Sequence, residues 1–93
     1  MIDIQQLQRA LAKVLSLQGF YYKANKTAEA LGYTPTREVG VSAQEVQKVL
    51  PEIVVPAPID DKYLTVYYER LVPLLIEAIK EINTEVQLLK RKL

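Results

Sequence analysis

Large apolar side chains recur through residues 68–93 at alternating spacings of four and three, the pattern of a coiled-coil helix. They are Tyr68, Val72, Leu75, Ile79, Ile82, Val86, Leu89 and Leu93, and together they are called the seam below. In heptad notation, positions a are Val72, Ile79, Val86 and Leu93, and positions d are the other four. The pattern predicts one long helix that packs against helices of other copies.

The residues beside the seam divide the predicted helix in two. Up to Ala78 the apolar surface is broad, whereas from Ile82 onward Leu88 is the one apolar residue outside the seam. A helix of this length runs about 39 Å, which exceeds the radius of about 12 Å of a compact domain of this size. We therefore expect a body at residues 1–80 and a projecting, self-associating end at residues 81–93.

The seam alone leaves the number of helices open. Branched side chains at a with Leu at d favour two strands, while an isoleucine at d, such as Ile82, favours three. Glu85 at g and Lys90 at e permit one interchain ion pair, which is worth little by itself.

Upstream of the seam, shorter periodic runs predict an α+β fold with a small, mostly antiparallel sheet. An amphipathic pattern capped by Asp3 predicts an N-terminal helix, and Ser42 with Glu45 forms a capping box that opens a short middle helix ended by Pro51. The expected helices are 4–17, a single turn 27–31 between Thr27 and Gly32, 43–50 and 68–93; the expected strands are 20–24, 38–41, 53–55 and 63–66.

Three further local features lead to expectations. Pro73 lies in the first turns of the long helix, removes one backbone donor and predicts a bend or a loosened first turn. Asn25-Lys26 and Asp60-Asp61-Lys62 are predicted turns. Tyrosines such as Tyr21 and Tyr22 are expected to pack half-buried.

The composition argues against most kinds of catalytic and ligand-binding site. The 93 residues contain no cysteine and no histidine, so there is no thiolate nucleophile and no imidazole base or ligand. A net charge of +1 gives no field for nucleic acid or an anionic membrane, and Lys90-Arg91-Lys92 is explained by a helix C-terminus. Asp60-Asp61 lacks the ligand count of a metal site. We expect a soluble domain with no metal, no cofactor, no nucleic-acid or membrane partner and no small-molecule substrate.

Two longer stretches carry a family resemblance. Residues 40–54, GVSAQEVQKVLPEIV, resemble the G-x-x-AQEV-x-x-x-LPE-x-V signature of the intramolecular chaperone auto-processing domains found at the C-terminal ends of phage tailspikes and tail fibres. Residues 63–82, YLTVYYERLVPLLIEAIKEI, resemble that family's YLSVDYEKLVPLLIEAIKEL segment, Pro73 included. Ala10-Leu11 through Leu17, Gly19 and Tyr22 resemble its first helix and strand.

The resemblance implies a homotrimer that aligns three chains of the upstream fibre or spike domain while they fold, in the host cytoplasm during virion assembly. The long helix then forms a parallel trimeric coiled coil. Gln44 is the best matched polar residue of the motif, and either supports cleavage-site geometry or only packs in the first turn of its helix.

The family cleaves itself before a serine, in a pattern like S-D-x-R-L-K that supplies a Ser nucleophile and a Lys base. Counted back along the matched helix, the lysine falls at about Met1 and the serine before it, so neither is present in this sequence. We expect no catalytic residue and no self-cleavage in this chain. Two alternatives stay open: an auto-processing serine endopeptidase whose dyad lies upstream of Met1, and a plain coiled-coil adaptor.

Overall fold

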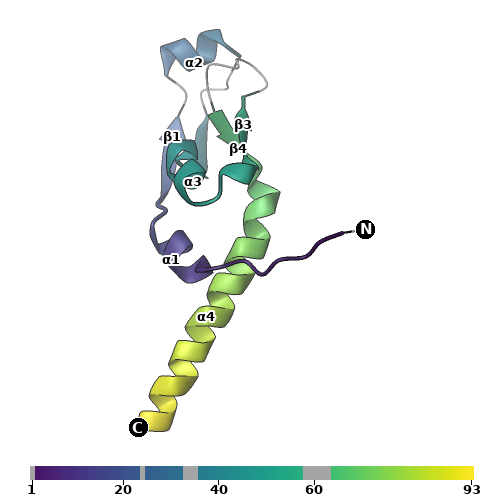
Figure 1. The fold of residues 1–93 in the computed structure, drawn as a ribbon. Helices are drawn as coiled ribbons and strands as arrows, with labels where there is room; N and C mark the ends of the chain where they lie inside the picture. The colour runs from purple at the N-terminus through teal and green to yellow at the C-terminus, as the bar shows by residue number, and fades with distance from the viewer. Residues whose placement is uncertain (1, 24, 33–35, 58–63) are drawn as a thin grey trace. The chain divides into compact units, whose positions relative to one another are not determined.

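The computed structural model describes residues 2–23, 25–32, 36–57 and 64–93. Their contacts form two compact units. One unit spans Leu17–Tyr67, and the other combines the N-terminal residues up to Ser16 with Tyr68–Leu93. The class is α+β, as predicted, with the elements labelled in Figure 1.

An antiparallel pair of strands opens the first unit. Strand β1 (Gly19–Lys23) pairs with β2 (Arg37–Val41), from Gly19 opposite Val41 to Lys23 opposite Arg37. Both strands were predicted. Every residue of β1 is exposed, whereas Gly40 in β2 is buried.

The prediction of half-burial is wrong for Tyr21 but fits Tyr22, which is 46% exposed. Tyr21 is 67% exposed, and the Arg37 guanidinium lies 3.7 Å from its ring centroid in a cation–π contact. Tyr22 meets Phe20 edge to face, with ring centroids 6.4 Å apart.

Helix α2 (Lys26–Ala30) follows β1 and begins earlier than predicted. Its cap is Asn25, whose side-chain oxygen accepts a hydrogen bond from the Ala28 amide at 2.8 Å. Thr27 lies inside the helix and is not the cap, because Asn25 already has the extended backbone that an N-cap requires. Gly32 follows the helix with a φ of 102°, the left-handed conformation expected of a helix-ending glycine.

Helix α3 (Ala43–Val49) is capped by Ser42, whose hydroxyl accepts from the Glu45 amide at 3.3 Å, as the capping box predicted. The helix ends before Pro51, which opens a short 3₁₀ helix, η1 (Pro51–Ile53). Ile53 is therefore in a helical turn and not in the predicted strand. Its carbonyl accepts from the Tyr67 amide at 2.9 Å.

A second pair of antiparallel strands, β3 (Val54–Pro56) and β4 (Leu64–Val66), packs with α3. The structure thus has two separate two-stranded sheets where one small sheet was expected. The buried apolar residues of this unit are Val46, Leu50, Ile53, Ala57 and Val66. The predicted turn at Asp60-Asp61-Lys62 and the predicted strand residue Tyr63 lie outside the described residues.

In the other unit, helix α1 (Ala10–Leu15) is shorter than the predicted 4–17 and packs on the long helix. Asp3 is not its cap: Arg9 is, in a left-handed conformation with φ 55°. Residues 2–8 have no regular secondary structure, and Ile4 is 91% exposed. A short helix is stabilised mainly by packing of its apolar face, and the first residues of the predicted helix lack that packing.

The long helix α4 (Leu71–Lys92) follows a 3₁₀ turn, η2 (Tyr68–Arg70), so the first turn is loosened as predicted. Pro73 is the third residue of α4. The amide of that position has no partner within a helix, so the expected loss of a backbone hydrogen bond does not occur. The last turn carries Lys90, Arg91 and Lys92, which complement the negative end of the helix.

Candidate interaction surface on the C-terminal helix

Helix α4 has a buried face and an exposed apolar face. Leu71, Leu74 and Ala78 are buried at 9%, 0% and 3% exposure. The seam lies one position further along the sequence, which turns it by about 100° around the helix axis. The helix therefore uses a different set of residues for packing within the chain than the seam.

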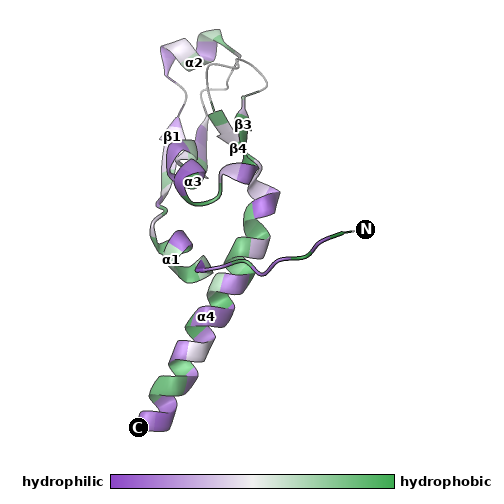
Figure 2. Ribbon diagram, viewed as in Figure 1, coloured by the Kyte–Doolittle hydropathy of each residue, from purple (hydrophilic) through white to green (hydrophobic). Residues whose placement is uncertain are grey.

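All eight seam residues are exposed in the single chain. Val86 has the smallest exposed fraction, 39%, and Ile79 has 65%, while the terminal Leu93 is fully exposed. The exposure includes Tyr68, Val72 and Leu75 in the first half of the helix, so packing within the chain leaves the seam uncovered in both halves. Figure 2 shows apolar residues alternating with polar ones along α4.

An exposed apolar surface as long as the seam is unusual for a monomeric protein. Single exposed apolar residues are common, but a contiguous row of large ones marks a contact surface. From Ile82 to Leu93 every residue is exposed, so packing within the chain buries none of the residues in this part of α4. None of the described helices is long and apolar enough to cross a bilayer.

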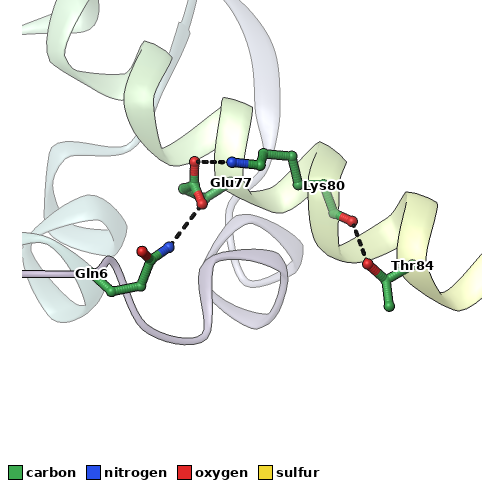
Figure 3. Close-up of polar contacts among 4 residues, drawn as sticks. All are labelled: Gln6, Glu77, Lys80 and Thr84. Carbon is green, nitrogen blue, oxygen red and sulfur yellow. Dashed lines mark hydrogen bonds and ion pairs between the residues drawn. The ribbon is translucent and has the colours of Figure 1, made fainter.

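Two carboxylates of α4, those of Glu77 and Glu81, bind residues from the N-terminal part of the chain on a side of the helix away from the seam. Glu77 accepts a hydrogen bond from the Gln6 side chain at 2.9 Å and pairs with Lys80 at 3.3 Å (Figure 3). Glu81 accepts a hydrogen bond from the Leu11 amide, and so satisfies a free donor in the first turn of α1. These contacts fix the start of α1 against α4.

Sequence reasoning missed the roles of Glu77 and Glu81. Both lie outside the seam, at helix positions where a charged residue is expected to face solvent. The partner of Glu77 is 71 residues away in the sequence, and the partner of Glu81 is 70 residues away. Their spacing of four places them on one side of the helix, but that pattern alone is equally typical of a solvated face.

The candidate polar residue Gln44 lies in the first turn of α3 and is exposed. Its side-chain oxygen accepts a hydrogen bond from the Ser42 hydroxyl at 3.2 Å. The second serine of the chain, Ser16, donates to the Lys13 carbonyl oxygen at 2.6 Å. Both serines therefore serve helix ends in this structure, Ser42 at the start of α3 and Ser16 at the end of α1.

The family model described as "Chaperone of endosialidase" matches residues 2–55, more than half of the sequence. The chain belongs to this family. The match confirms the resemblance seen in the signature motif, and it covers α1, both strands of the first sheet, α3 and the start of β3.

Curated relatives extend the similarity to the long helix. The long tail fiber protein Gp37 of Enterobacteria phage K3 is 34% identical over 93 residues, which cover 98% of this chain and 7% of that protein. The Gp37 of phage T2 gives the same figures. The Gp37 of phage M1 is 36% identical over 85 residues, 90% of this chain and 34% of the relative. This member of the endosialidase-chaperone family thus spans a small part of the fibre proteins it matches.

Proposed function

We propose that this chain is a C-terminal intramolecular chaperone and trimerisation module of a phage tail fibre or tailspike. The observation that supports it most directly is the continuous exposure of the seam on α4. Family membership supports the chaperone role, and the similarity to Gp37 proteins supports a fibre as the upstream partner. The proposed interface is Tyr68, Val72, Leu75, Ile79, Ile82, Val86, Leu89 and Leu93.

In the proposed mechanism, three α4 helices pack in parallel through their seams. Each apolar side chain enters a hole between four residues of a neighbour, so a slip of one residue would turn polar positions into the core. The next register with apolar matching is a full heptad away, about 10 Å along the axis. The coiled coil therefore fixes the relative height of three chains, and a fibre that starts from it begins in register.

The proposal assigns residues 1–80 to a chaperone body and residues 81–93 to a projecting end that contacts other copies. The chain works in the host cytoplasm during virion assembly and requires no cofactor, metal or small molecule. It is not itself a peptidase, because neither the Ser nor the Lys of the family dyad matches a residue of this sequence. The hydrogen bonds of Ser16 and Ser42 support this, since each hydroxyl serves a helix end.

A fibre polypeptide that ends in this chain provides the test of chaperoning. We compare the wild-type polypeptide with a variant carrying Ile79→Asp and Val86→Asp, and with a Thr84→Asp control on the outer side of the same helix. The yield of soluble trimeric fibre should fall in the seam variant and persist in the control. Equal yields in all three would overturn the proposal.

The second candidate is an auto-processing serine endopeptidase whose dyad precedes residue 1. The lack of regular structure at residues 2–8 favours it, because a peptidase needs an extended, accessible backbone near the bond that it cleaves. Its test is the coding sequence upstream of Met1: a Ser codon followed five residues later by Lys, together with loss of cleavage in the Ser→Ala variant, would establish it. Unchanged cleavage in that variant would reject the dyad.

A further inference from the structure

The N-terminal residues 2–8, called the arm, cross the outer side of α4. The Leu11 amide is bound to Glu81 at heptad position c, and the Gln6 side chain is bound to Glu77 at position f. Gln5, Gln6 and Leu7 then border a hollow of about 280 Å³ with Pro73, Ile76 and Lys80 of α4. Those three residues occupy positions b and e, so the arm leads from the c side to the e side of the helix.

The arm ends in apolar residues without cover. Ile2 is 86% exposed and Ile4 is 91% exposed, and in Figure 1 the N-terminal end of the chain extends past α4. On the opposite flank of the seam, α1 packs on α4, and its last residue, Leu15, is 73% exposed.

In a parallel trimer the e flank of one helix faces the g flank of the next. Ala78 at position g is buried, and Glu81 at the adjacent position c binds the start of α1, so α1 occupies the g side. The arm of one copy and the α1 of the next are thereby placed beside each other. Their charges also match, since Asp3 is the one charged residue of the arm, while Arg9 and Lys13 lie in and just before α1.

From this arrangement we propose that the arm of each chain binds α1 of the neighbouring copy, with Ile2 and Ile4 packed on Leu15 and with the opposite charges of the two segments adding attraction. Three such contacts form a closed belt around the coiled coil, which heterologous contacts do when the rotation closes. The inference rests on the proposed trimer. It assigns the partner of the arm as a second copy of this chain.

The lack of cysteine in the sequence makes a direct test possible. A tagged Ile4→Cys chain is refolded with an untagged Leu15→Cys chain and oxidised with oxidised glutathione. Each chain has one thiol, so a mixed disulfide joins two chains. The matched control pairs Ile4→Cys with Leu88→Cys, which lies at the same position c as Glu81 but two turns nearer the C-terminus.

We expect the Ile4–Leu15 disulfide to form about tenfold faster than the control, because a contact holds the thiols at high effective concentration. Light scattering of the same samples before oxidation separates the two proposals. Equal rates in a trimer would overturn the belt and leave the trimer standing, whereas a monomer would overturn both.

A second variant tests the apolar contact without cysteine. Ile4→Asp should raise the concentration at which the trimer is half dissociated by about tenfold, since it removes apolar burial from each of the contacts. Gln8→Asp adds the same charge to an exposed polar residue of the arm and should change that concentration little. The same dissociation concentration for both variants would contradict the inference.

Discussion

Replacing Ile82 by aspartate should weaken the proposed trimer. Ile82 is the seam residue at which α4 stops packing against the rest of its own chain. Ile82 occupies position d and is 46% exposed in the single chain. It is the first residue of the stretch in which all side chains to the C-terminus are exposed. Its substitution should therefore affect association and leave the fold of the chain intact.

The magnitude follows from the surface that association would cover. Burying the exposed part of Ile82 contributes about 1 kcal/mol per chain, and forcing a carboxylate into the apolar seam costs at least about 2 kcal/mol more. For three chains the loss is about 9 kcal/mol. Since the half-dissociation concentration of a trimer varies as the square root of its dissociation constant, it should rise by about three orders of magnitude.

Sedimentation velocity over a concentration series measures this shift, with circular dichroism to follow the fold. The matched control is Thr84→Asp, two residues further along the helix at position f, which adds the same charge outside the seam. We expect the Ile82 variant to sediment as a folded monomer at concentrations where wild type and control are trimers. If the Ile82 variant remains trimeric with the control, the chains associate through another surface and the reasoning about the seam fails.

Three further substitutions test the account within one chain. Val46→Ala should lower the free energy of unfolding by about 2 kcal/mol, measured by urea denaturation, because it opens a cavity at a fully buried residue of α3; an unchanged midpoint would show that this core is loosely packed. Ser42→Ala should cost about 1 kcal/mol by loss of the α3 cap, and Ser42→Asp, which keeps an acceptor, should recover most of it. Glu81→Ala should speed amide hydrogen exchange in the first turn of α1 by about tenfold, since the Leu11 amide loses its acceptor. Glu81→Gln keeps an acceptor oxygen and should change the exchange rate less. Equal exchange rates in the two variants would argue against the contact.

The elements that the sequence predicted well are those set by local signals. The capping box at Ser42, the stop at Pro51 and the helix-ending Gly32 each act through neighbours within a few residues, and each lies where it was expected. The seam is also a local pattern, because its spacing follows from the helix period alone. Its exposure along the whole of α4 needed the structure.

The predictions were wrong where contacts between residues far apart in the sequence determine the secondary structure. The N-terminal helix was predicted from residue 4 because Ile4 and Leu7 fit its period, but it begins at Ala10, beside the acceptor that Glu81 supplies from the far end of the chain. The single predicted sheet became two because strand composition does not specify pairing partners. The role of Gln44 in cleavage geometry stays a prediction. In the structure its side-chain oxygen accepts a hydrogen bond from the Ser42 hydroxyl at the start of the same helix.

The central claim, that the seam joins three copies, is tested most directly by the mass of the wild-type chain in solution. Light scattering at micromolar concentration should give three times the chain mass of 10.6 kDa. A mass of one chain would contradict the account of the seam, and a mass of two chains would contradict the trimer.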